Sequence, residues 1–181
     1  MRESRSKNDD MEEREMDDEA ESAGDVFEML KTDHRQVQEL FTRFEDADKR
    51  TRASIAEETL TALEVHAALE EEIVYPAIAE VVEDEETINE AKEEHHVAKL
   101  LIKELHKMDA GDEAFATKFK VWGELVGHHI EEEEGEMFPQ AQEGGFESES
   151  IWEEVSKRKA KLMQKYEGGK KSSGSRRKKA A

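Results

Sequence analysis

The chain has 181 residues, of which 41% are charged and 35% belong to the hydrophobic class, and its formal net charge is −20. This length allows one domain with a single core, but the shortage of apolar residues predicts that part of the chain lies outside any packed fold. The acidic charge argues against general nucleic-acid binding by the body of the protein, because it would repel the phosphate backbone.

The composition also limits the kinds of site that the chain can form. Cysteine is absent, which excludes disulfides, thiolate nucleophiles, iron–sulfur clusters and cysteine-bound zinc. Any metal must therefore bind to nitrogen and oxygen. The sequence has no signal-peptide pattern at its start and no run of 18 apolar residues, so we expect a cytoplasmic protein that does not contact membranes.

Residues 1–23 begin the chain with no aromatic, β-branched or leucine side chain, which predicts a disordered acidic arm. Four segments with apolar residues at helical spacing follow. They lie at about residues 25–46, 53–75, 86–108 and 113–137. Short links between helices force antiparallel neighbours. We therefore predict an all-α protein in which residues 24–140 form an antiparallel, up-down four-helix bundle.

Two further segments complete the chain. Residues 147–167 carry Ile151, Val155 and Leu162 at helical spacing, which predicts an extra C-terminal amphipathic helix against an end or flank of the bundle. Residues 168–181 combine lysine and arginine with glycine, serine and alanine, which predicts a disordered basic tail. A solvated terminus is the simple interpretation of this tail, and weak contact with nucleic acid is the alternative.

One pattern occurs twice at a constant offset in the second and fourth predicted helices. Each copy reads His-x-x-x-Glu-Glu and leads to an aromatic residue and a proline, with His66 and Glu70 in the first copy and His129 and Glu133 in the second. Side chains at i and i+4 project from one face of a helix about 6 Å apart. Each copy therefore predicts a nitrogen and an oxygen ligand for the same metal site.

The other two helices each carry a histidine on the apolar stripe, His34 after Leu30 and His95 after Ala91. An unpaired buried imidazole costs on the order of 1–3 kcal/mol, so each needs a partner. A single such histidine would indicate an ordinary core residue. One on every helix, with two carboxylates that burial would otherwise keep protonated, indicates a metal site.

Adjacent histidines offer competing registers. His95 is in phase with the apolar residues of its helix, whereas His96 is followed three and seven residues later by lysine. The repeated pattern aligns His129 with His66, which favours His129 over the neighbouring His128. We therefore prefer His95 and His129.

The doubled His-x-x-x-Glu pattern with its proline, together with single histidines on the alternate helices, resembles the hemerythrin-like HHE cation-binding family over residues 25–139. The resemblance implies two iron ions in an oxo- or hydroxo-bridged centre, bridged by both glutamates, although manganese or zinc would suit the same donors. It also implies that the family's metal ligands correspond to the residues that the pattern selects, which are His34, His66, Glu70, His95, His129 and Glu133.

Oxygen-carrying hemerythrins have a further histidine four residues after the one on the third helix, where this chain has Lys99. A protonated lysine has no lone pair to offer a metal. We therefore expect two histidines per iron, His34 with His66 and His95 with His129.

Three functions are compatible with this pattern. The leading hypothesis is a metal-binding protein that binds, senses or buffers oxygen, nitric oxide or iron. The second is a di-iron enzyme with peroxidase, catalase-like or ferroxidase activity, and the third is a bundle whose histidines bind no metal. In the first two, the expected partner is a small diatomic molecule or peroxide.

Overall fold

A computed structural model describes residues 24–177. Residues 1–23, expected to form the acidic arm, and residues 178–181 lie outside the described residues. All regular structure between residues 24 and 177 is helical. The elements are α1 (Val26–Asp46), α2 (Lys49–Leu69), η1 (Glu70–Val74), α3 (Tyr75–Ala79), α4 (Glu86–Leu105), α5 (Glu113–Glu132), η2 (Glu133–Met137), α6 (Phe138–Glu143), η3 (Ser148–Ile151) and α7 (Trp152–Arg177).

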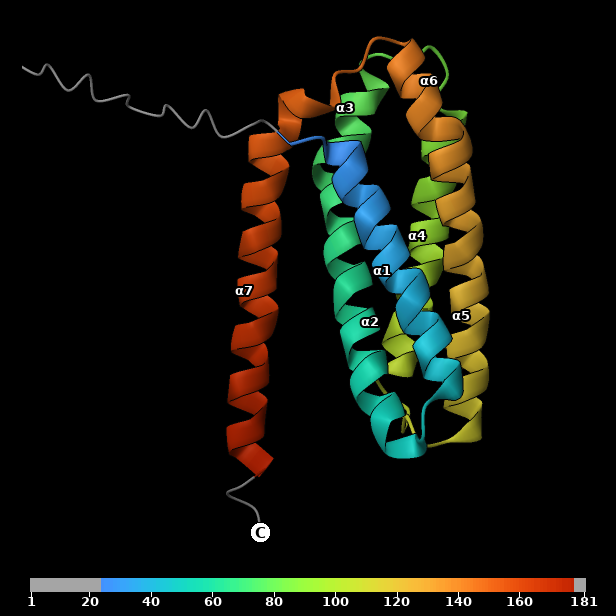
Figure 1. Ribbon diagram of the computed structural model, residues 1–181, viewed down its shortest axis with the longest axis vertical. Coiled ribbons are helices and arrows are strands. Elements are labelled where there is room, and N and C mark those ends of the chain that lie inside the picture. Colours follow the sequence, from blue (N-terminus) through green and yellow to red (C-terminus); the bar gives the residue numbers. More distant parts are fainter. Residues whose placement is uncertain (1–23, 178–181) are drawn as a thin grey trace, which may run out of the picture.

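The helices α1, α2, α4 and α5 pack side by side as an antiparallel bundle, which confirms the predicted all-α fold (Figure 1). Aspartates begin the first two helices by accepting hydrogen bonds from free backbone N–H groups. Asp25 accepts from Phe27 N at 2.8 Å, and Asp48 accepts from Thr51 N at 2.8 Å. Among the described residues, no helix is long and apolar enough to span a membrane.

The second and fourth bundle helices each continue through a π-helical turn, η1 or η2, into a short α-helix. In each turn the backbone N–H of the aromatic residue bonds to the carbonyl five residues earlier, from Tyr75 to Glu70 and from Phe138 to Glu133. A proline follows each aromatic residue and has no N–H to continue the α-helical pattern. Such π-helical turns often occur at functional sites.

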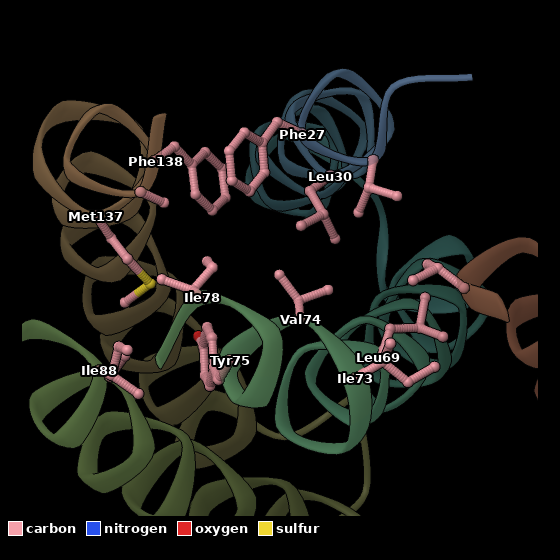
Figure 2. Close-up of a cluster of buried hydrophobic side chains, with 14 of the residues drawn as sticks. Phe27, Leu30, Leu69, Ile73, Val74, Tyr75, Ile78, Ile88, Met137 and Phe138 are labelled. Carbon is pink, nitrogen blue, oxygen red and sulfur yellow. The ribbon is translucent and has the colours of Figure 1, made fainter. Parts of the chain in front are cut away.

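Buried apolar side chains form two clusters, one toward each end of the bundle. The cluster at the end of α3 and α6 includes Phe27 and Phe138, whose rings stack with centroids 4.4 Å apart (Figure 2). Along α1, Leu30 belongs to this cluster and Val37 to the other, and the buried His34 lies between them. A polar layer therefore crosses the middle of the core.

The C-terminal helix α7 lies along the flank of α2 (Figure 1). It buries Val155 and Leu162 against the bundle, two of the apolar residues expected to face it. The structure continues α7 to Arg177. This range includes residues 168–177, and the expected disordered basic tail at residues 168–181 remains a prediction.

The turn after α6 provides a test of packing at this end of the bundle. A Cβ on Gly144 would lie 2.6 Å from the backbone oxygen of Val81, whereas a Cβ on Gly135 would meet nothing within 4 Å. We expect Gly144→Ala to lower the free energy of unfolding by about 1–3 kcal/mol through this overlap. Gly135→Ala should leave it unchanged or raise it by up to about 1 kcal/mol. Urea unfolding measures both, and equal stability of the two variants would contradict the close contact.

Candidate metal centre

The structure brings the six residues selected from the sequence together in the polar layer. Each is at most 6% exposed, and both glutamates are fully buried. They form two overlapping groups in which the candidate ligand atoms lie within 4.8 Å of one another. The first group is His34, His66, Glu70 and Glu133, and the second is Glu70, His95 and His129.

In the first group, imidazole nitrogens face each other and the carboxylates. The Nε2 atoms of His34 and His66 are 3.0 Å apart. His66 Nε2 lies 2.9 Å from Glu70 Oε1, and His34 Nε2 lies 3.2 Å from Glu133 Oε2. Two nitrogens and two oxygens therefore converge on one point between α1 and the motif helices.

The second group repeats this arrangement. The Nε2 atoms of His95 and His129 are also 3.0 Å apart. His95 Nε2 lies 3.4 Å from Glu70 Oε2, and His129 Nε2 lies 3.5 Å from Glu133 Oε2. Glu70 thus presents one oxygen to each group, whereas Glu133 approaches a histidine of each group with the same oxygen, Oε2.

An outer layer of carboxylates contacts the Nδ1 atoms of three of the histidines, whose Nε2 atoms face the buried glutamates. His34 Nδ1 lies 2.7 Å from Glu134, His95 Nδ1 lies 3.0 Å from Glu71, and His129 Nδ1 lies 2.8 Å from Glu94. Carboxylates in this position fix the ring orientation of metal-binding histidines and increase their basicity. The spacing of the motifs alone did not reveal a role for these three glutamates.

The outer carboxylates have recognisable positions in the sequence. Glu71 and Glu134 are the second glutamates of the two repeated motifs, and Glu94 comes directly before His95. Asp33 comes directly before His34 in the same way and lies near His66. An acidic residue next to four of the six candidate ligands was therefore the available signal.

The facing nitrogens of His95 and His129 require a positive charge between them. Each ring has its Nδ1 against a carboxylate, so in a neutral ring Nδ1 carries the proton and Nε2 presents a lone pair. Two lone pairs 3.0 Å apart repel each other unless a proton or a metal ion lies between them. Two nitrogens at right angles around a metal, each about 2.1 Å from it, would be about 3.0 Å apart.

Unpaired carboxylate oxygens also fit a cation. Both oxygens of Glu70 and Oε2 of Glu133 are buried with no hydrogen-bond donor among the described residues. Buried carboxylates without partners are costly. Nitrogen and oxygen donors of this kind suit iron, manganese or zinc.

A comparison with models of known protein families identifies the family of the chain. The family model described as "Hemerythrin HHE cation binding domain" matches residues 25–141. The chain belongs to the hemerythrin HHE cation-binding family. The match includes all six candidate ligands and ends before α7. No curated protein sequence matches the chain.

A solved structure shares the fold. It is that of a hemerythrin HHE cation-binding domain-containing protein from Mycobacterium kansasii, with a TM-score of 0.64 and 22% sequence identity. The similarity covers 81% of this chain and 89% of the other. At this level of identity it supports the bundle fold and not the details of the site.

The histidines of the competing registers lie at the surface of the hemerythrin HHE domain. His96 is exposed, and the side chain of His128 is 61% exposed. His128 lies near Glu94 and Glu132 at 3.3 and 3.4 Å, in a group that is open to solvent. Neither histidine reaches the buried groups, in agreement with the preferred register.

In the metal-free protein, the charged groups of the centre shift one another's pKa values. Burial disfavours charge on His66, but the negative charge of Glu70 and the side-chain contact with Asp33 outweigh burial and raise the pKa of His66 to about 10. Burial would also raise the pKa of Glu133, but its contact with His34 and the charge of His129 hold that pKa below its usual range. Negative carboxylates and positive imidazoles thus stabilise one another.

A small cavity lies beside the centre, on the side of the apolar cluster that contains Val37. Its volume is about 40 Å³, and the four candidate histidines form part of its wall. Apolar side chains such as Ile102, Trp122 and Val126 line most of the rest, and Lys99 lies at its edge. This volume holds a molecule or two of the size of water.

The raised pKa of His66 predicts how the stability of the metal-free protein depends on pH. The stabilisation is fully present below the ordinary value of 6.5 and is lost as pH rises through about 10. We expect the melting temperature of the metal-free protein to fall across this range. His66→Gln should flatten that dependence, and a wild-type melting temperature that rises between pH 6.5 and 10 would contradict the charge balance.

Proposed function

We propose that the chain is a di-iron protein that binds, senses or buffers oxygen, nitric oxide or iron. Each ion is held by two histidines, and both glutamates bridge the ions. The ligands are His34 and His66 for one ion, His95 and His129 for the other, and Glu70 and Glu133 for both. The observation that supports this most strongly is the pair of imidazole nitrogens facing each other 3.0 Å apart in the second group.

The cavity supports a small ligand. Sites for drug-sized organic molecules usually have volumes of about 300–1,000 Å³, whereas this cavity measures about 40 Å³. A diatomic molecule or peroxide fits that space, and its apolar wall favours uncharged molecules such as oxygen and nitric oxide. Bound iron would supply the coordination positions at which such a ligand attaches. We also propose a cytoplasmic location, which suits a chain without cysteine.

A di-iron enzyme with peroxidase, catalase-like or ferroxidase activity is the second candidate, and Tyr75 favours it. Its hydroxyl donates to Glu133 Oε1 at 2.7 Å and lies 3.4 Å from His95 Nε2. Burial and the charges of Glu70 and Glu133 raise the pKa of Tyr75 well above its usual value. The hydroxyl therefore keeps its proton and serves as a hydrogen-bond donor beside the centre.

Two measurements on the iron-loaded protein separate these candidates. Sustained turnover of hydrogen peroxide identifies the enzyme. A stable optical change on adding oxygen or nitric oxide, without peroxide turnover, identifies the binding protein.

Variants of neighbouring glutamates test the ligand assignment. We expect the wild-type chain to bind two iron ions and Glu70→Ala or Glu133→Ala to bind fewer, since their oxygens face the histidines. The controls Glu72→Ala and Glu132→Ala remove glutamates whose carboxylates lie outside the buried groups. Iron content after identical anaerobic loading is the measurement. Equal loss in all four variants would show that the assignment is wrong.

Position 99 tests the expectation of two histidines per ion. Lys99 lines the cavity, and its ammonium pairs with Glu71. We expect Lys99→His to place a third imidazole near the ion of His95 and His129 and to close a position open to ligands. The variant should lose reactivity with peroxide and form a longer-lived complex with oxygen. Stopped-flow absorbance of the reduced protein measures both.

The control for this experiment is Lys103→His, which lies one turn further along α4, is exposed and does not line the cavity. It should behave as the wild type. If Lys99→His also leaves the spectra and peroxide consumption unchanged, position 99 does not face the iron.

A further inference from the structure

One candidate ligand, His66, lacks the outer carboxylate contact that the other three histidines make. The other Nδ1 atoms lie 2.7–3.0 Å from a glutamate oxygen. The nearest carboxylate oxygen to His66 Nδ1 is Oδ2 of Asp33, at 3.7 Å. This nitrogen is buried and has no hydrogen-bond partner among the described residues. The outer layer is therefore incomplete at one of four equivalent places.

Asp33 occupies the place from which it should complete that layer. Glu94 comes directly before His95 on α4 and accepts from His129 on the following helix. Asp33 comes directly before His34 on α1 and faces His66 on the following helix. The two halves of the bundle therefore predict a hydrogen bond from His66 to Asp33.

Instead of contacting His66 closely, the Asp33 carboxylate forms an ion pair with a lysine of α7. Lys159 Nζ donates to Asp33 Oδ1 at 2.7 Å and to Oδ2 at 2.6 Å. Both oxygens therefore accept from the ammonium group, and Oδ2 remains 3.7 Å from His66 Nδ1. Lys159 lies outside residues 25–141, which match the family model.

We propose that Lys159 is a positioning residue that holds Asp33 away from His66 and so makes the metal position of His34 and His66 the more weakly held of the two. The proposal rests on the proposed function. Loss of an outer carboxylate from a metal-binding histidine typically lowers metal affinity about 10–100-fold. The helix α7 thereby distinguishes two metal positions whose inner ligands are alike.

The surroundings of the ion pair allow Asp33 to turn. A pocket of about 290 Å³ lies between α7 and the bundle, and Asp33, Val65 and Lys159 are among its lining residues. Aspartate is one methylene shorter than Glu94, so limited reach is the rival explanation of the 3.7 Å distance. Removal of the ammonium group separates the two explanations, because reach does not depend on Lys159.

The chain provides a matched control in the residue next to Lys159. Arg158 also joins α7 to the bundle, donating to both oxygens of Glu72 at 2.6 and 2.8 Å. That pair is exposed, and Glu72 contacts none of the candidate ligand histidines through an ion pair or hydrogen bond that the structure describes. Arg158→Met therefore weakens the attachment of α7 without freeing Asp33.

The test is release of iron(II) from the full chain, loaded with two ions, to a colorimetric chelator under anaerobic conditions. We expect the wild type to release iron in two phases, the faster from the position served by His66. Lys159→Met should slow the faster phase about tenfold and leave the slower phase unchanged. Arg158→Met should leave both phases unchanged. Lys159→Arg, which can still pair with Asp33, should release iron as the wild type does.

Several results would overturn the proposal. These are single-phase release from the wild type, an unchanged or accelerated faster phase in Lys159→Met, and equal slowing by Lys159→Met and Arg158→Met. Thermal melting of each variant shows whether it remains folded. A wild-type chain that binds no iron pair would instead contradict the proposed function itself, so the two failures are distinguishable.

Discussion

The structure depends on compensating the negative charge of two carboxylates that are completely buried among four imidazoles. Glu70 and Glu133 have no exposed surface, and three of their four oxygens lack a hydrogen-bond donor among the described residues. In the metal-free protein, protons on imidazoles supply part of the balancing charge, as the raised pKa of His66 indicates. In the proposed function, two cations supply it instead. Binding of metal would then stabilise the fold as well as form the site.

The same constraint explains how the bundle is built around the centre. Apolar clusters lie on both sides of the polar layer and exclude water from it. Each π-helical turn begins at a buried glutamate, with a proline after it that cannot continue the α-helical hydrogen bonds. The outer carboxylates then orient the rings of His34, His95 and His129. Local backbone geometry and side-chain contacts thus together position the buried glutamates and histidines.

The bundle and the inward position of the six candidate ligands could be predicted because both follow from local spacing. Apolar periodicity places His34 and His95 on inward faces, and the i, i+4 pattern does so for the two motifs. The contacts of Glu71 and Asp33 could not be predicted in this way, since they depend on which helix packs opposite. The interaction of Lys159 with Asp33 joins α7 to α1, and only the folded chain shows that pairing.

The proposed centre differs from an ordinary polar core in one respect that a single measurement can test, namely the positions of two metal ions. Anomalous X-ray diffraction at the iron absorption edge, from crystals of the iron-loaded full chain, locates iron directly. We predict two peaks, one between His34 and His66 and one between His95 and His129, with Glu70 and Glu133 reaching both. No anomalous peak among these six side chains, with the bundle intact, would contradict the assignment of a di-iron centre.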